Sequence, residues 1–191
     1  MRSTKGYTFI ELMVVLAIVA IASAIAFSNH LAQKPRAQLR QASREMLSHL
    51  RGIRQQSITT GQITTIYFSD DDDLIQIDGD NISVADNEYV IVPGRIRKTL
   101  PSKVRFGYPD NVTETPRGGN LSIFSRDGIS FNNKRVSFQP NGTANGLNGQ
   151  IYLTSASNDP QAQTPQHESF AIDVNLTGQV RLYKWKNTRW Q

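Results

Sequence analysis

The sequence predicts an α+β protein in which one long N-terminal helix precedes and packs on a C-terminal, β-sandwich-like domain. Three observations support this class. The apolar run from Tyr7 to Phe27 is long enough for a helix that crosses a hydrocarbon core of about 30 Å. From Arg36 to Ile58 apolar residues recur at three- and four-residue steps, as in an amphipathic helix. After Gly61 the chain changes to short runs of β-branched and aromatic residues separated by Pro, Gly and Asn.

A short basic leader, residues 1–6, precedes the apolar run and ends in Gly6. A secretory signal peptide has its small-residue cleavage site on the far side of a shorter apolar core. Here the small residue comes first, so cleavage after Gly6 would leave the apolar segment on the mature protein. The new terminus would be a free amine on Tyr7, and one carboxylate, Glu11, lies inside the segment.

The stretch Gly6-Tyr7-Thr8-Phe9-Ile10-Glu11-Leu12 resembles the class III signal of type IV prepilins and pseudopilins. The resemblance implies that a prepilin peptidase cleaves after Gly6 and N-methylates Tyr7, which stands where phenylalanine is usual. It also marks Glu11 as an assembly residue. An ionised carboxylate in a bilayer costs roughly 2.5–3.5 kcal/mol without a partner. Within one helix Glu11 lies about 6 Å along the axis from Tyr7, so we expect its partner to be the amine of a neighbouring subunit. The alternative is a carboxylate that only reaches the headgroups.

The second half of the expected helix, residues 29–61, carries an apolar stripe and a basic remainder. Pro35 is compatible with a first turn or a kink, and Gly61 is a plausible stop. The stripe consists of Leu39, Ala42, Met46, Leu50 and Ile53, and the basic residues are Arg36, Arg40, Arg44, Arg51 and Arg54. We interpret the arginines as a solvated face on a globular core. The alternative is that they meet acidic neighbours in an assembly or anionic lipid headgroups.

Period-two patterns predict the strands of the remaining domain, residues 62–191. The clearest is a hairpin in which Phe170, Ile172, Val174 and Leu176 alternate with polar or small residues before a turn at Thr177-Gly178. Residues 155–166 are predicted to form a polar loop. The complete set of predicted strands is Ile63–Phe68, Leu74–Ile77, Tyr89–Val92, Lys103–Phe106, Leu121–Phe124, Val136–Phe138, Ile151–Leu153, Phe170–Leu176 and Val180–Tyr183.

Three later stretches are similar to GspH/FimT-type minor pilins. Leu50–Ile58 followed by Ile63–Ile66 looks like their helix-to-strand junction. Val136–Ala144 is similar to their F-x-P-x-G segment, and Ile172–Arg181 looks like their closing hairpin.

Composition and motifs argue against an enzyme, and we expect no cofactor and no metal site. Cysteine is absent, and His30, His49 and His167 lie far apart in a sequence without a zinc or phosphate-binding motif. Residues 62–93 contain eight acidic residues and no Lys or Arg. We interpret this acidic segment as a solvated hairpin tip that deters edge pairing. Calcium binding is the alternative, although the EF-hand order is missing.

The carboxyl end has the opposite charge. Cations alternate with aromatic residues there, a combination that suits phosphates and unpaired bases; the residues are Arg181, Lys184, Lys186 and Arg189 with Tyr183, Trp185 and Trp190. Some FimT-type minor pilins bind DNA through a G-R-x-R motif on this hairpin. The corresponding positions are Gly178-Gln179-Val180-Arg181, where Gln179 replaces the first arginine. The alternative is a terminal strand whose basic side chains cover a sheet edge.

The resemblance implies a minor pseudopilin or pilin of a type II secretion or type IV pilus machine that helps initiate or cap a filament. Its expected partners are other pilins or pseudopilins, prepilin peptidase and inner-membrane lipid. We expect residues 7–28 to span the bacterial inner membrane and residues 62–191 to face the periplasm. Charges flank both ends of the span, so this orientation follows from the resemblance. Two alternatives stay open: a DNA-binding minor pilin for natural transformation, and an ordinary single-span membrane protein.

Overall fold

The structure is a computed structural model of the 191-residue chain. It describes residues 8–69, 73–77, 80–109, 112–118, 128–145, 148–155, 168–186 and 189–191, without the side chains of 24–33 and 73–77. The chain divides into two compact units, Met1–Lys34 and Pro35–Gln191. Each unit is described by itself.

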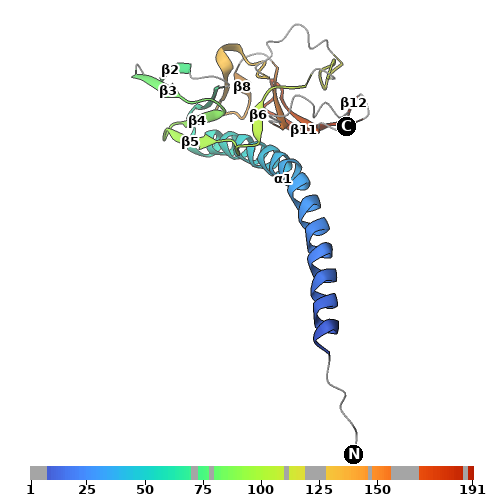
Figure 1. The fold of residues 1–191 in the computed structure, drawn as a ribbon. Helices are drawn as coiled ribbons and strands as arrows, with labels where there is room; N and C mark the ends of the chain where they lie inside the picture. Colours follow the sequence, from blue (N-terminus) through green and yellow to red (C-terminus); the bar gives the residue numbers. More distant parts are fainter. Residues whose placement is uncertain are drawn as a thin grey trace, which may run out of the picture. The chain divides into compact units, whose positions relative to one another are not determined.

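The two predicted helical segments form one helix, α1, from Phe9 to Thr60 (Figure 1). Pro35 lies inside it. Gly61 follows its last residue with a φ of +68° and donates its N–H to the carbonyl oxygen of Ser57 at 3.0 Å. A left-handed residue is the common end of a helix, and glycine adopts it without a Cβ penalty. Across the part of the chain that the structure describes, no helix has the length and apolar character needed to cross a membrane.

The predicted apolar stripe is confirmed. Its five residues are all buried, and Leu39, Met46 and Leu50 have no exposed surface. Three- and four-residue steps place these side chains on one side of the helix. They form a single hydrophobic core with residues of two β-sheets, among them Ile66, Phe138 and Ile172.

The strands of the second unit form two antiparallel five-stranded sheets and a separate hairpin. The first sheet has the order β5 (Ile96–Thr99), β4 (Glu88–Val92), β1 (Thr64–Ser69), β7 (Arg135–Phe138) and β8 (Ala144–Asn145). The second has the order β12 (Arg189–Trp190), β11 (Val180–Lys186), β10 (Ser169–Val174), β9 (Gly149–Ser155) and β6 (Val104–Phe106). The hairpin joins β2 (Asp73–Ile77) to β3 (Asp80–Val84), and the short helix η2 spans Asn132–Lys134.

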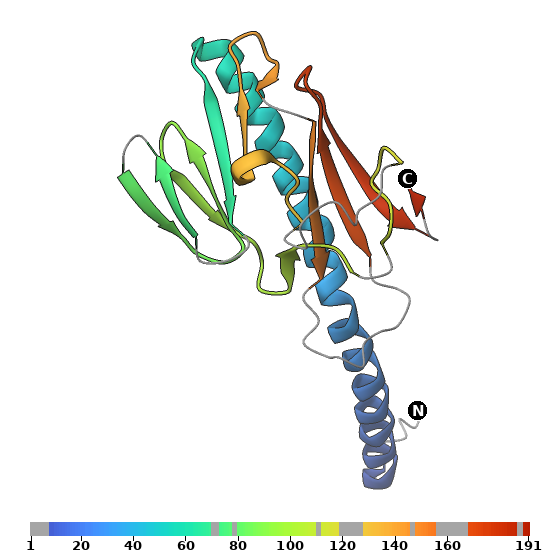
Figure 2. The ribbon, with the colours of Figure 1, turned by 90° about the horizontal axis from the view of Figure 1, so that it is seen from above.

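Figure 2 shows the two sheets on either side of the second half of α1, within the second unit. Both sheets contribute to the core that covers the helix stripe. The α+β fold class, with a long helix packed on a two-sheet domain, is therefore confirmed.

The second sheet buries both of its faces. On β10, Phe170, Ile172 and Val174 belong to the core shared with the helix. Ala171 alternates with them and belongs to a second cluster on the opposite face. Central strands that are buried on both faces need apolar or paired side chains at every position. All six residues of β10 are accordingly buried.

Most predicted strands coincide with observed ones, and the differences have physical reasons. β10 ends at Val174, and Leu176 lies half-exposed in the following turn. The sequence patterns missed β3, β5, β8 and β12. Every residue of β5 (Ile-Arg-Lys-Thr) is exposed on a sheet edge, so no apolar alternation marks it. The predicted strand Leu121–Phe124 and loop residues 156–166 lie outside the described residues.

Candidate functional site

The predicted assembly segment is described from Thr8 onward, so Gly6 and Tyr7 lie outside the described residues. Glu11 lies in the first turn of α1, and its backbone N–H donates to the Thr8 hydroxyl at 3.3 Å. This is the side-chain half of a capping box, and a carboxylate in the first turn also matches the helix dipole. The capping geometry gives Thr8 a local structural role and uses only the backbone of Glu11.

The helix segment around Glu11 is covered with exposed apolar side chains. Ten large ones are more than half exposed in the first unit; they are Phe9, Ile10, Leu12, Met13, Val14, Val15, Leu16, Ile18, Val19 and Ile21. Soluble monomers rarely leave a continuous apolar surface of this kind uncovered. The segment therefore requires lipid or another protein against it.

Arg40, on the basic side of the helix, does not point freely into solvent. Its Nε and Nη2 atoms donate to the two carboxylate oxygens of Glu168 at 2.9 and 2.6 Å. Lys184 donates to the same carboxylate at 2.9 Å. The hydrogen bond from Arg40, together with Lys184 and against the effect of burial, lowers the pKa of Glu168 to about 2. This network ties the helix to β10 and β11.

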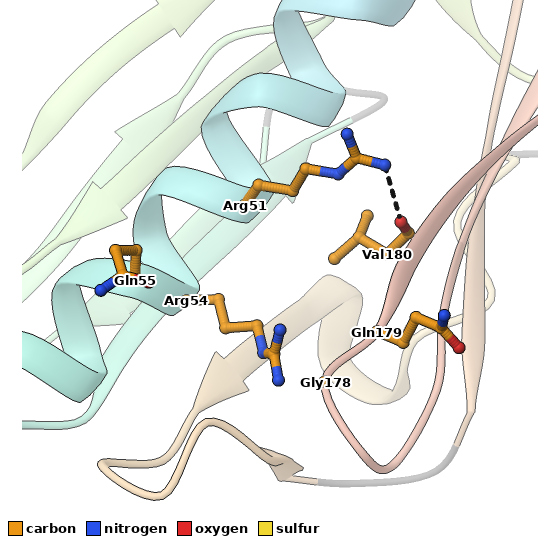
Figure 3. Close-up of a pocket in the computed structure, with 6 residues that line it drawn as sticks. All are labelled: Arg51, Arg54, Gln55, Gly178, Gln179 and Val180. Carbon is orange, nitrogen blue, oxygen red and sulfur yellow. Dashed lines mark hydrogen bonds between the residues drawn. The ribbon is translucent and has the colours of Figure 1, made fainter.

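Arg51 and Arg54 line a pocket of about 360 Å³ between the helix and the turn that joins β10 to β11 (Figure 3). The Nη2 atom of Arg51 donates to the carbonyl of Val180 at 3.2 Å. The Nε atom of Arg54 donates to the carbonyl of Gly142 at 2.8 Å. The pocket is completed by Gln55, Gly178 and Gln179. Two guanidinium groups are therefore held at one site by neutral backbone acceptors.

Two glycines allow the turns around this pocket to meet. Gly178 has a φ of +75°, and a Cβ built on it would overlap the carbonyl oxygen of Gly142 and lie 2.9 Å from Nε of Arg54. Gly142 has a φ of +80°, and a Cβ built on it would lie 2.8 Å from Cδ1 of Ile58 on the helix. Only glycine accepts both the backbone angle and the contact. The glycine of the F-x-P-x-G segment and the glycine of the Thr-Gly turn are thus both needed for the two turns to approach each other and the helix.

The predicted DNA-binding residues of the carboxyl end lie on two faces of β11. Side chains alternate along a strand, so Arg181, Tyr183 and Trp185 share one face while Lys184 and Lys186 share the other. Trp185 is only 6% exposed. Its ring packs on Trp190 with 5.1 Å between centroids, and Tyr183 packs partly against the same cluster.

The cations of this set differ in their environments. Lys184 is paired with Glu168, whereas Arg181, Lys186 and Arg189 are exposed. The structure therefore does not bring the predicted cations and aromatic residues together on one open surface.

Two parts of the chain match known family models. Residues 1–27 match the prokaryotic N-terminal methylation motif. Residues 42–178, most of the chain, match the type II transport protein GspH. The chain belongs to the GspH family. This is a family of structural pilins and pseudopilins, which implies assembly with other pilins, and the N-terminal motif implies processing by prepilin peptidase.

Among curated proteins, none matches. A solved crystal structure of the type IV minor pilin FimU from Pseudomonas aeruginosa is similar, with 12% identity and a TM-score of 0.42. The similarity covers 82% of this chain and 94% of that one.

In this GspH-family protein the outer face of the second sheet carries a buried polar network. Arg117 donates two hydrogen bonds to the Asp173 carboxylate, at 2.8 and 2.7 Å. Gln150 donates to Asp173 at 3.0 Å, and Tyr152 donates to Gln150 at 3.3 Å. The bond to Asp173 raises the pKa of Arg117, and burial raises the pKa of Tyr152. Arg117 lies in a stretch without a recognisable sequence pattern, so the sequence does not predict its pairing. The alternation along β10 predicts only that Asp173 lies on this face.

The acidic segment of the GspH-family chain includes the predicted hairpin, β2–β3. Asp80 pairs with Arg95 at 2.8 Å. Glu88 accepts the backbone N–H of Ala85 at 3.0 Å and lies 3.5 Å from Arg97. Within the described ranges, no group of three or more His, Cys, Asp or Glu residues is arranged to hold a metal ion. Asp80 and Glu88 are thus engaged with arginines that follow this segment in the chain.

Proposed function

We propose that this GspH-family chain is a minor pilin or pseudopilin of a type II secretion or type IV pilus machine, and that it helps initiate or cap a filament. The observation that carries the proposal is the methylation motif at residues 1–27 on a helix with a continuous exposed apolar surface. In this account the inner membrane covers that surface first, and neighbouring helices cover it in the filament. Prepilin peptidase cleaves after Gly6 and methylates Tyr7.

Glu11 selects the position of the helix in the filament. Among the residues that the structure describes, no cation pairs with its carboxylate. Transfer from lipid into a helix bundle is favoured when such a carboxylate gains a partner, because an unpaired charge is costly in an apolar environment. The N-methylated amine of Tyr7 stays cationic at neutral pH. We propose that the Tyr7 amine of a neighbouring subunit is this partner.

A substitution experiment separates this role from membrane insertion. Glu11→Ala and the nearly isosteric Glu11→Gln are expected to insert into the inner membrane but to be absent from purified filaments. Ser23→Ala is the matched control, because Ser23 is a polar residue of the same helix whose hydroxyl donates to the carbonyl of Val19 in that helix. Wild-type amounts of Glu11→Ala in filaments would refute the assembly role.

The β domain then provides the choice of neighbours. We propose that residues 62–191 face the periplasm and recognise other subunits by shape and charge, without a catalytic step or a cofactor. The interior of this domain is already filled by one shared core. Its recognition surfaces are therefore edges, turns and pockets of the two sheets.

DNA uptake is the second candidate function, and the exposed cations Arg181, Lys186 and Arg189 favour it. The test is a titration of the full chain in detergent micelles with a single-stranded oligonucleotide at several salt concentrations. Phosphate binding predicts an affinity that falls steeply with salt and is lost in Arg181→Ala. Absence of binding at low salt would exclude this function. The same titration with Lys184→Ala tests the lysine on the opposite face of β11 from Arg181, which is paired with Glu168.

A further inference from the structure

The arginine pocket between α1 and the β10–β11 turn has the features of a preorganised anion site. Arg51 donates to one backbone carbonyl and Arg54 to two, those of Gly142 and, at 3.5 Å, Thr177, which fixes the direction of each guanidinium group. A guanidinium has five N–H donors in a planar fork. Each arginine therefore keeps donors for a ligand in the pocket of about 360 Å³.

Two arginines with two-point hydrogen bonds elsewhere in the domain have acidic partners. Arg40 pairs with Glu168, and Arg117 pairs with Asp173, both with two hydrogen bonds. Arg51 and Arg54 belong to no ion pair among the residues that the structure describes. Two like charges on successive turns of one helix repel each other modestly. An anion between them would relieve this repulsion.

We propose that the pocket binds a carboxylate side chain from an acidic segment of a neighbouring subunit in the filament. This inference rests on the proposed function and adds the chemistry of one subunit contact. Arginine forms paired hydrogen bonds with a carboxylate, and such bonds are about twice as strong as neutral ones. The walls include Gln55 and Gln179, whose amides suit a polar peptide.

A nucleic acid fits this site less well. Binding of single strands combines a basic groove that follows several phosphates with aromatic faces for the bases. The aromatic residues of β11 do not offer such faces, because Trp185 is buried and Tyr183 is partly covered, and Lys184 is paired with Glu168. The pocket thus offers two guanidinium groups from successive turns of one helix, which matches a short anionic segment.

The test measures binding of a short acidic peptide to the full chain in detergent micelles. The probe is an acetylated, amidated peptide with the core Asp-Glu-Asp, and its control has the core Asn-Gln-Asn. Arg51→Gln is expected to weaken acidic-peptide binding about tenfold, which corresponds to the loss of a charge-assisted contact. The neutral peptide should not bind detectably.

Gln179→Glu tests the pocket without removing an arginine that also bonds to the backbone of the fold. Gln179 accepts a hydrogen bond from Asn175 through Oε1, and glutamate retains that acceptor. A carboxylate at this position, on the wall of the pocket, would repel an acidic peptide and should also weaken its binding about tenfold. Arg44→Gln is the matched control, because Arg44 is exposed on the same helix and lies outside the pocket. Its affinity should stay within about twofold of the wild type.

Three results would overturn the inference: no binding of the acidic peptide to the wild type, equal weakening by Arg44→Gln, or unchanged binding in Gln179→Glu. Tighter binding of a short single-stranded oligonucleotide, lost in the same variants, would assign the pocket to phosphate instead. Peptide binding does not involve Glu11. If the acidic peptide does not bind while Glu11→Ala is absent from filaments as expected, this contact is refuted and the proposed function stands.

Discussion

Replacing Gly178 by alanine should separate the turn between β10 and β11 from the turn that follows β7. The added Cβ would overlap the carbonyl oxygen of Gly142 and lie 2.9 Å from Nε of Arg54. Both neighbours are backbone or hydrogen-bonded groups, so neither can move without breaking the 2.8 Å bond between Arg54 and Gly142. The variant tests whether this close approach holds the end of the helix on the sheets.

The expected cost has two parts. A non-glycine residue in the left-handed region costs roughly 1–2 kcal/mol. Loss of a hydrogen bond from a charged donor costs roughly 1.5–3 kcal/mol. Together they predict a decrease of about 2.5–5 kcal/mol in the free energy of unfolding, or roughly 10 °C in Tm for a chain of this size.

Gly61→Ala is the matched control for the backbone part. Gly61 has a similar φ of +68°, and a Cβ at that position meets nothing within 4 Å. Its replacement should cost only the roughly 1–2 kcal/mol of the left-handed conformation. Urea unfolding followed by circular dichroism measures both variants in the same detergent. Equal destabilisation of the two would refute the proposed role of the contact, because the Gly142 carbonyl would then add nothing.

Three further predictions concern the core and its ion pairs. Leu50→Ala should lower the free energy of unfolding by about 2–5 kcal/mol in urea, because Leu50 is fully buried; a cost under about 1 kcal/mol would contradict the shared core. Because the pKa of Glu168 is lowered from 4.5 to about 2, its contribution to stability is present above about pH 4.5 and is lost as the pH falls toward 2. Glu168→Gln should flatten the pH dependence of Tm in that window. An unchanged pH dependence would show that the bond between Glu168 and Arg40 does not cause it. Asp173→Asn should cost roughly 1–3 kcal/mol in urea, since it weakens the pair with Arg117, and a neutral effect would contradict a buried network.

The helix and the main strands could be predicted because their signals are local. Leu39, Met46 and Leu50 repeat at helical steps, and burial of one helix face requires that repeat. The alternation along β10 likewise marks the sheet face that meets the helix. β5 could not be found in this way, since its exposed residues carry no apolar pattern.

The contacts of the basic helix face could not be predicted, because they join residues far apart in the chain. Arg51 and Arg54 donate to backbone carbonyls of Val180 and Gly142, and a carbonyl has no residue-type signature. Their interpretation as a solvated face was therefore incomplete. The separation of Lys184 from Trp185, in contrast, was already implied by strand alternation. Composition alone groups the cations and aromatic residues of the carboxyl end, whereas strand alternation assigns the lysines and the aromatic residues of β11 to opposite faces.

Mass spectrometry of the native protein tests the central claim most directly. The account predicts a mature chain that begins at Tyr7 and carries one additional methyl group on its terminal amine. An intact Met1 with an unmodified tyrosine would contradict it, because no methylated amine would then be available to pair with Glu11 across a filament contact.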